Sequence, residues 1–454
     1  MGPDYKRPEA AAPAQYKELA GWREAQPRDA VPRGPWWTLF EDAELDALMK
    51  RVELSNQSIR AAEARVREAR AVADQARAGL FPTLGAGASA TRSKSPSLAN
   101  APSLARGAVN TFNASLNAGW ELDIWGKVRR SIESGEASWQ ASAGDLEAAR
   151  LSVRASLAQN YFALRVAAGT QKLLEDTVAA YQRSLELTRN RYAAGVVARV
   201  DVVQAEVQLK SAQAQLVDIG VDRAQLEHAV ALLLGVAPAE FSLAPAPITD
   251  MKMPAIPIGM PSQLLERRPD IAAAERGMAA ANAQIGVAKA AYFPTLTLSG
   301  VTGFRGSSTS TLFSVPSRLW SLGATASQPL FDGGLRRAVT AEKAAAYDAE
   351  VANYRQTVLT GFQEVEDNLA ALRILEEEAQ IQDEVVRGAR HALELTVNQY
   401  QAGVVSYLNV IAAQATALTN ERAAAAILGR RLTAATALIK ALGGGWSAAE
   451  LPAS

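Results

Sequence analysis

Thirteen consecutive residues in the first half of the chain alternate between apolar and polar side chains without exception. Phe112 begins the run and Ile124 ends it. A second alternation extends from Trp320 to Ser327, and weaker ones cover 84–90 and 296–304. A strict period of two is typical of a strand with one buried face. The pattern therefore predicts four strands, over about 83–92, 112–125, 295–304 and 319–331.

Two long stretches, 103–237 and 330–451, contain no proline. Proline costs about 3 kcal/mol inside a helix, so long helices can form here, and both stretches are rich in Ala, Glu, Gln, Arg and Leu. A glycine, Gly195 or Gly403, follows each longest segment and suits the residue after a helix end. We expect helices at 131–194, 200–234, 335–402 and 408–442. The longest would measure about 100 Å at 1.5 Å per residue.

The two halves of the chain repeat one another in order. FPTL at 81–84 recurs at 293–296, offset by 212, and RYAAGVVARVDV (191–202) recurs as QYQAGVVSYLNV (399–410), offset by 208. Gly126 with its following arginines recurs at Gly333, offset by 207. Chance similarity between Ala-rich helices would not give three ordered matches, so we infer a duplication.

The duplication divides the chain into five segments. Each repeat is expected to begin with a helix, continue through two strands and a very long helix, and return through a tip turn and a second helix. The segments are an N-terminal arm (1–50), repeat 1 (51–234), a linker (235–260), repeat 2 (261–442) and a C-terminal tail (443–454).

Composition excludes several classes of function. Lys and Arg number 47 and Asp and Glu number 47, which argues against a dedicated nucleic-acid binder. The chain has no Cys, so disulfides, thiolate metal sites and Cys nucleophiles are excluded. Only two histidines are present, without metal-ligand spacing, and no run of 18 apolar residues predicts a membrane-spanning helix. We expect no enzyme, no cofactor and no metal.

Alternation alone does not separate a soluble hairpin from strands that lie in lipid. Two features favour lipid: the strands have about the ten residues that a tilted membrane strand needs, and aromatic residues stand at the strand–helix junctions. These candidate girdle residues are Phe81, Trp125, Phe293 and Phe331. Four strands cannot close a barrel, for which roughly eight are the minimum, so several chains would have to share one. Three chains would supply twelve strands.

Six motifs in order resemble the TolC-like outer-membrane efflux channels, and specifically their NodT-type lipoprotein branch, which serves RND pumps. They are GPDYKRP (2–8), the paired FPTL, WELDIWGK (120–127) with QPLFDGG (328–334), the two YxxGVV turns, LLERRPDI (264–271) and KALGGGW (440–446). The resemblance implies a mainly α fold with a small β part. In a homotrimer, a 12-stranded outer-membrane β-barrel would continue into a 12-helix periplasmic α-barrel. The N-terminal arm, the linker and the tail would form an equatorial belt.

The same resemblance implies a function and a set of partners. The protein would be the outer-membrane exit duct of a tripartite RND efflux pump, passively conducting drugs or other small toxic compounds from periplasm to exterior. Its partners would be a periplasmic adaptor, an inner-membrane RND transporter and outer-membrane lipid. The branch carries a lipidated Cys just before GPDY, where this chain has Met1, so we expect the anchor in the native precursor. The alternatives are a type I secretion outlet and a soluble coiled-coil scaffold.

Family members close their channel at the periplasmic tips. By position, the gate residues fall on Asp201, Tyr400 and Leu408, with Arg199 as a candidate partner of the Asp201 carboxylate. Arg189 and Arg191 are further candidates. An arginine of some members falls on Val405 and two further acids fall on Asn409 and Ala412, so the acidic constriction is depleted. Asp201 and Asn409 have an alternative role, because either can cap the start of a helix.

The two tip turns are the candidate docking sites for the adaptor. Small residues allow another helical hairpin to approach closely, and a trimer would present six related turns. The candidate docking residues are Gly195, Val196, Val197, Gly403, Val404 and Val405.

Overall fold

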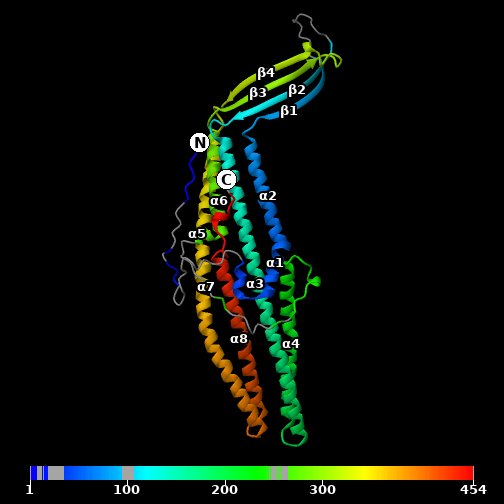
Figure 1. Cartoon of the computed structure of the whole chain (residues 1–454), viewed down its shortest axis with the longest axis vertical. Coiled ribbons are helices and arrows are strands. Elements are labelled where there is room, and N and C mark those ends of the chain that lie inside the picture. The colour runs from blue at the N-terminus through cyan, green and yellow to red at the C-terminus, as the bar shows by residue number, and fades with distance from the viewer. Residues whose placement is uncertain are drawn as a thin grey trace.

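The protein is an elongated bundle of helices with a four-stranded sheet at one end (Figure 1). The computed structural model describes residues 2–7, 13, 15–18, 35–94, 107–244, 246, 253–254, 256 and 264–452. Parts of the linker expected at 235–260 and of the N-terminal arm therefore lie outside the described residues. Among those described, no helix is both long and apolar enough to cross a membrane.

The sheet is antiparallel and its strands follow the order of the chain. It consists of β1 (Thr83–Ser93), β2 (Val109–Leu122), β3 (Thr295–Gly306) and β4 (Arg318–Ser327), joined in the order β1-β2-β3-β4. The two hairpins thus come from the two repeats and pair through β2 and β3. The outer edges of β1 and β4 have no strand partner within the described chain.

The helices repeat the same order in each half. Repeat 1 has α1 (Ala43–Ser55), α2 (Gln57–Ala78), α3 (Lys127–Ala193) and α4 (Arg199–Leu233). Repeat 2 has α5 (Leu264–Arg267), α6 (Pro269–Ala290), α7 (Leu335–Gln401) and α8 (Tyr407–Ala441). Both α3 and α7 have 67 residues, about 100 Å of helix. Within the described ranges the structure also has short 3-10 helices at Trp36–Phe40, Pro238–Glu240, Val315–Ser317 and Ala448–Glu450.

Three boundaries differ from those the sequence predicts, for local reasons. β2 ends at Leu122, before the expected 125, and α3 begins at Lys127, before the expected 131. The Asp123 carboxylate accepts hydrogen bonds from the N–H groups of Val128 and Arg129 at 2.9 and 3.0 Å, so it caps α3 instead of extending the strand. β4 ends at Ser327, before the expected 331, because Pro329 has no N–H for a ladder.

The core lies half-way along the molecule, where α1 packs against α3. Trp36, Tyr161 and Tyr354 are fully buried there, and the ring of Phe40 lies 4.7 Å from that of Phe162. The Tyr161 hydroxyl donates to the Asp42 carboxylate at 2.7 Å. Burial of large aromatic side chains supplies much of the hydrophobic stabilisation of a bundle. This belt therefore holds the two repeats together between the sheet and the helical tips.

Arg268 ties three helices together at the edge of this core. Its buried guanidinium pairs with Asp270 at 2.6 Å and Glu364 at 2.5 Å, and it donates to the Ala441 carbonyl at 3.3 Å. Burial opposes the charged form of the guanidinium, but the two carboxylates outweigh burial and raise the pKa of Arg268. The side chain therefore joins the start of α6 to α7 and to the end of α8.

Replacing Arg268 with methionine should destabilise the protein by about 2–3 kcal/mol, because it leaves two carboxylates and a carbonyl without their donor. Far-ultraviolet circular dichroism of the melting transition checks this. Arg129→Met is the matched control, since Arg129 is an exposed arginine paired with Asp123, and such pairs contribute about 0–1 kcal/mol. Equal melting temperatures for the Arg268 and Arg129 variants would contradict this role of Arg268.

Candidate functional site

The end of the bundle farthest from the sheet is formed by two tight helical turns (Figure 1). The N–H of Gly195 donates to the Tyr192 carbonyl and that of Val196 to the Arg191 carbonyl, both at 2.9 Å. Gly403 and Val404 repeat both bonds to the end of α7, at 3.0 and 2.9 Å. This pair of hydrogen bonds requires a residue in the left-handed backbone conformation, and both glycines have a positive φ, 72° and 76°.

A cluster of tyrosines joins the two hairpins just above these turns. Tyr400 from α7 is only 4% exposed, and its hydroxyl lies 3.3 Å from the Thr188 hydroxyl of α3. The Tyr400 and Tyr407 rings are 5.4 Å apart, and Ser184 of α3 donates to the Tyr407 hydroxyl at 3.1 Å. Burial raises the pKa of Tyr407, which keeps its hydroxyl protonated. The cluster therefore fastens α3 of repeat 1 to α7 and α8 of repeat 2.

Arg191 holds Tyr400 from the side of repeat 1. Its guanidinium donates to the Tyr400 carbonyl at 2.6 Å and lies 4.7 Å from the centre of the Tyr400 ring. A cation at that distance over an aromatic face contributes about 0.5–2 kcal/mol. One side chain thus caps the end of α7 and stacks on its tyrosine.

The remaining predicted gate residues do not join this cluster within one chain. The Asp201 carboxylate accepts from the Ala198 N–H at 3.1 Å, which is the capping role left open above. Leu408 and Asn409 are exposed at the start of α8. Of the basic residues considered for Asp201, Arg189 pairs with Glu206 at 2.6 Å and Arg191 holds Tyr400. Arg199 is exposed and makes no ion pair inside the described ranges.

The two tip turns are exposed to solvent, with little packed against their glycines. A Cβ at Gly195 would meet nothing within 4 Å, and at Gly403 only the Arg191 guanidinium at 3.8 Å. Val196 and Val404 are exposed, whereas Val197 and Val405 are half-buried and Val405 packs against the tyrosine cluster. The two turns therefore offer small, mostly apolar surfaces to solvent.

The two faces of the sheet differ in chemistry. Because paired residues share a face, the register places Leu84, Ala118 and Leu322 on one side. That side is mostly apolar and includes Ala86, Ala88, Ala90, Phe112, Ala114, Leu116, Trp120, Leu296, Leu298, Phe304, Trp320, Ala324 and Ala326. The other side carries mostly small polar residues, with Val109, Val301 and Leu319 as exceptions: Thr83, Ser89, Thr91, Asn113, Ser115, Asn117, Thr297, Ser299, Ser321 and Thr325.

The four candidate girdle residues all lie at the helix end of the sheet but form two groups. Trp125 and Phe293 stack at 4.8 Å, and the Trp125 indole N–H donates to the Pro294 carbonyl at 2.7 Å. Phe81 and Phe331 project into solvent, 69% and 91% exposed. Exposed aromatic rings at the end of an apolar face are typical of a membrane interface.

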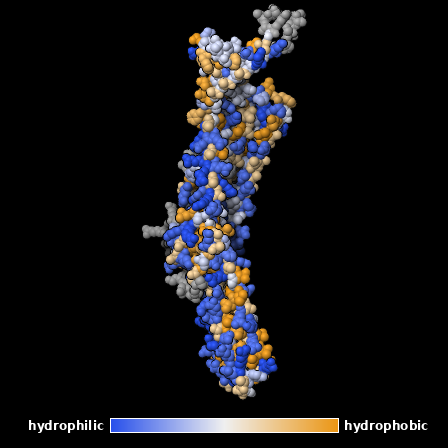
Figure 2. Space-filling model, turned by 90° about the vertical axis from the view of Figure 1, so that its right-hand side faces the viewer, coloured by the Kyte–Doolittle hydropathy of each residue, from blue (hydrophilic) through white to orange (hydrophobic). Residues whose placement is uncertain are grey.

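Both lateral sides of the helical bundle expose an apolar seam. Along α4 the exposed residues Val200, Val203 and Val207 are followed by Val217 and Val221, at the 3.5-residue period of a coiled-coil seam. Figure 2 looks onto this side, and apolar atoms run down its lower half between hydrophilic ones. The helix α7, which lies at the opposite side of the lower bundle in Figure 1, exposes its own apolar residues Ile374, Ile381, Val385 and Leu395.

Sequence comparison assigns this architecture to a family. The family described as Outer membrane efflux protein matches residues 48–236 and 260–444, which is most of the chain. The chain belongs to the outer membrane efflux protein family. It is 33% identical over 440 residues to the pyoverdine export outer membrane protein OpmQ of Pseudomonas aeruginosa, covering 96% of this chain and 92% of OpmQ.

Two further relatives agree. The probable efflux pump outer membrane protein TtgC of Pseudomonas putida is 32% identical over 451 residues, covering 98% of this chain and 92% of TtgC. The solved outer-membrane channel OprN superposes with a TM-score of 0.91 at 32% identity, covering 98% of this chain and 99% of that one. This efflux-family protein is therefore an outer-membrane channel component of an efflux pump and not an enzyme. The predicted TolC-like family and mainly α fold are confirmed.

Sequence reasoning missed the residues that tie the tips together. The sequence suggests Arg191 only as a partner for Asp201, and it gives no sign that Thr188, Ser184 and Tyr407 lie at the same place. A signal existed for one of them: the repeat aligns Arg191 with Gln399, so the two tips were known to differ next to their equivalent tyrosines.

Proposed function

We propose that three copies of this efflux-family protein form one continuous duct across the outer membrane and the periplasm. The observation that carries the proposal concerns the two lateral sides of the chain. On each side, both the sheet and the helical bundle expose a surface that another copy could cover. On one side lie the edge of β1 and the helix α4, and on the other the edge of β4 and the helix α7 (Figure 1). Neither strand edge has a strand partner among the described residues, and both helices expose apolar seams. A head-to-tail contact between unlike sides closes into a ring.

The number of strands favours three copies over two. Two copies would give eight strands, whose interior side chains fill a barrel, whereas twelve leave room for an aqueous lumen. The polar, small-residue face of the sheet suits such a lumen, and the apolar face suits lipid. The exposed rings of Phe81 and Phe331 would then lie at the periplasmic interface of the outer membrane, with Trp125 and Phe293 stacked at the same end of the sheet.

The proposed duct takes part in a tripartite pump. A periplasmic adaptor would dock on the bare turns at Gly195 and Gly403, and an inner-membrane RND transporter would supply drugs or other small toxic compounds. The name of OpmQ, a pyoverdine export protein, supports export of small molecules over secretion of polypeptides. The tips would rest closed around Tyr400, Asp201 and Leu408, with Asn409 and Arg199 beside them, until the adaptor engages.

A lipid anchor at the N-terminus of the native precursor is part of the proposal. The described N-terminal residues run along α6 towards the sheet, and the chain end lies at the sheet's base (Figure 1). Asp4 pairs there with Arg130 at 2.7 Å, and the Tyr5 hydroxyl donates to the buried Glu275 at 2.5 Å. An acyl chain attached just before this segment would reach the membrane interface without moving it.

Native mass spectrometry of the detergent-solubilised protein tests the assembly. We expect one species at three times the 48.2 kDa chain, and aggregation when detergent is removed, because the apolar sheet faces would be exposed. A stable monomer that remains soluble without detergent would contradict the trimer and the membrane orientation together.

A further inference from the structure

Among the described residues, the end of the sheet farthest from the helices carries basic side chains and no acidic ones. The sequence has no Asp or Glu between Asp74 and Glu121 or between Glu275 and Asp332. These two stretches contain all of the four strands except Glu121 and Leu122, the last two residues of β2, which lie at the helix end of the sheet. Four described cations stand at the strand ends farthest from the helices: Arg92, Lys94, Arg305 and Arg318. A surface region with one sign of charge attracts ligands of the opposite sign.

Three of these four cations lie at the end of the apolar face. Arg318 pairs in register with Phe304, and Phe304 with Ala114, so all three share that face. Arg92 follows Ala88 and Ala90 on the same face of β1, and Lys94 comes two residues later. Arg305 pairs with Asn113 on the polar face instead.

These three cations are available for a ligand. Arg92, Lys94 and Arg318 are exposed, and none makes an ion pair or a side-chain hydrogen bond with the described residues. Lys and Arg side chains at the end of an apolar surface extend their charge to the boundary between lipid and water. At that boundary a membrane presents anionic lipid headgroups, and their phosphates are ligands for such cations.

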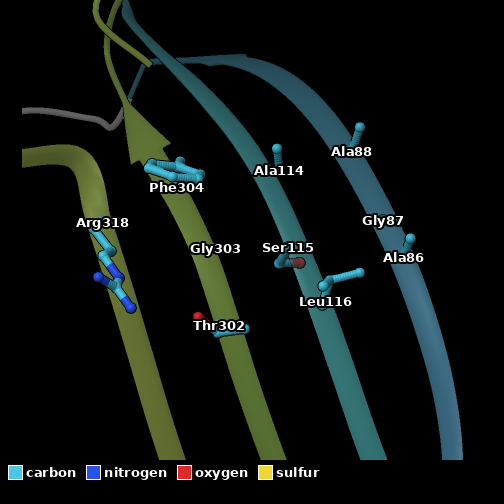
Figure 3. Close-up of a pocket in the computed structure, with 10 residues that line it drawn as sticks. All are labelled: Ala86, Gly87, Ala88, Ala114, Ser115, Leu116, Thr302, Gly303, Phe304 and Arg318. Atoms are coloured by element: carbon cyan, nitrogen blue, oxygen red, sulfur yellow. The ribbon is translucent and has the colours of Figure 1, made fainter. Parts of the chain in front are cut away.

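A hollow of about 470 Å³ opens on the same apolar face beside Arg318 (Figure 3). The small side chains of Ala86, Ala88 and Ala114 leave the space, with Leu116 and Phe304 beside them. Gly87 and Gly303, which also line the hollow, have no side chains. The hollow therefore offers apolar contact next to the Arg318 guanidinium. Such a site is complementary to a ligand that joins an acyl chain to an anionic group.

We propose that this outer-rim patch, made of Arg92, Lys94, Arg318 and the hollow, binds an acylated, phosphorylated lipid of the outer leaflet. An acyl chain occupies the hollow between Leu116 and Phe304, and a phosphate contacts the Arg318 guanidinium. The inference rests on the proposed function, since the apolar face must look into the membrane with the outer ends of its strands in the outer leaflet. The proposed function requires only that this face of the sheet be apolar, and the inference adds a specific lipid-binding site on it.

Native mass spectrometry with added lipid A tests the patch on the full-length protein in detergent. We expect the wild type to bind lipid A, and the dephosphorylated form to bind more weakly. Arg318→Ala and Arg92→Ala should each weaken lipid A binding about fivefold, the effect of one cation at a membrane surface. Ala114→Leu should also weaken binding, because it fills the hollow without changing the charge.

Arg305→Ala is the matched control, because it removes the same charge from the same end of the sheet on the opposite face. Equal loss of lipid A in the Arg305 and Arg318 variants, or no loss in the Arg318 and Arg92 variants, would overturn the patch. Displacement of lipid A by inorganic phosphate alone would overturn the role of the hollow. The same spectra report the oligomer, so a trimer without lipid preference refutes only this inference, and a detergent-free monomer refutes the proposed function.

Discussion

Replacing Tyr400 with alanine is expected to raise the resting conductance of the channel severalfold in a planar bilayer. The side chain is buried between the hairpins, where it contacts Thr188, Tyr407 and Arg191. Truncating a buried aromatic residue lowers stability by about 3–5 kcal/mol. At Tyr400 the contact that is weakened is the one between the two hairpins at the tip. Without that contact, α7 and α8 are free to move away from α3, and the closed state loses stability relative to the open one.

Tyr192→Ala is the matched control for this experiment. Tyr192 occupies the equivalent position in repeat 1, but its side chain is 46% exposed, so its removal should leave conductance unchanged. Cells carrying the Tyr400 variant should also become more sensitive to bulky antibiotics. If Tyr400→Ala conducts like the wild type, the constriction lies at another ring, and Leu408 is the next residue to replace.

Asp201 can be separated from Tyr400 by one conservative substitution. Asp201→Asn keeps the acceptor for the Ala198 N–H and removes the charge, as the natural Asn409 does at the equivalent position of repeat 2. Conductance altered by Asp201→Asn would assign the carboxylate charge to the gate. Conductance altered only by Asp201→Ala would assign its role to the helix cap.

The turns and the long helices could be predicted because their causes are local. A glycine with positive φ after an Ala-rich segment ends a helix wherever it stands, so Gly195 and Gly403 were readable from the sequence. Alternation identified the strands for the same reason. Their ends were misplaced where a local competitor acted, as Asp123 does by capping α3.

The tip cluster could not be predicted, because it depends on how two distant hairpins pack. Tyr192 and Tyr400 stand in nearly the same local sequence, yet one is exposed and the other buried. The difference arises because α3 packs against α8 and brings Arg191 onto Tyr400. Periodicity shows that each helix has an apolar face, but it does not say which tyrosine meets which arginine across 209 positions.

Replacing both Gly195 and Gly403 with tryptophan is expected to abolish export while the trimer still assembles. The proposed adaptor must approach these turns closely, and a Cβ at Gly195 has open space around it, so bulk added there projects towards the partner and not into the chain. Trimer assembly should survive because, in the proposed duct, it depends on the sheet edges and on the α4 and α7 seams, which do not include the two glycines. Drug susceptibility of cells and native mass spectrometry of the purified variant measure the two outcomes.

Tryptophan at Gly195 or Gly403 also strains the backbone, because both positions have a positive φ. The effect of side-chain size must therefore be separated from the effect of backbone strain. Asparagine tolerates a positive φ, and the double variant Gly195→Asn with Gly403→Asn should therefore keep both turns with a smaller obstruction. Adding Val196→Trp and Val404→Trp to the wild type tests bulk at exposed neighbours that need no unusual φ. We expect export to persist in the asparagine variant and to fail in both tryptophan variants. Normal drug resistance in the Val196 and Val404 variant would show that the partner does not contact the turns, and any defect of the glycine variant would then come from backbone strain alone.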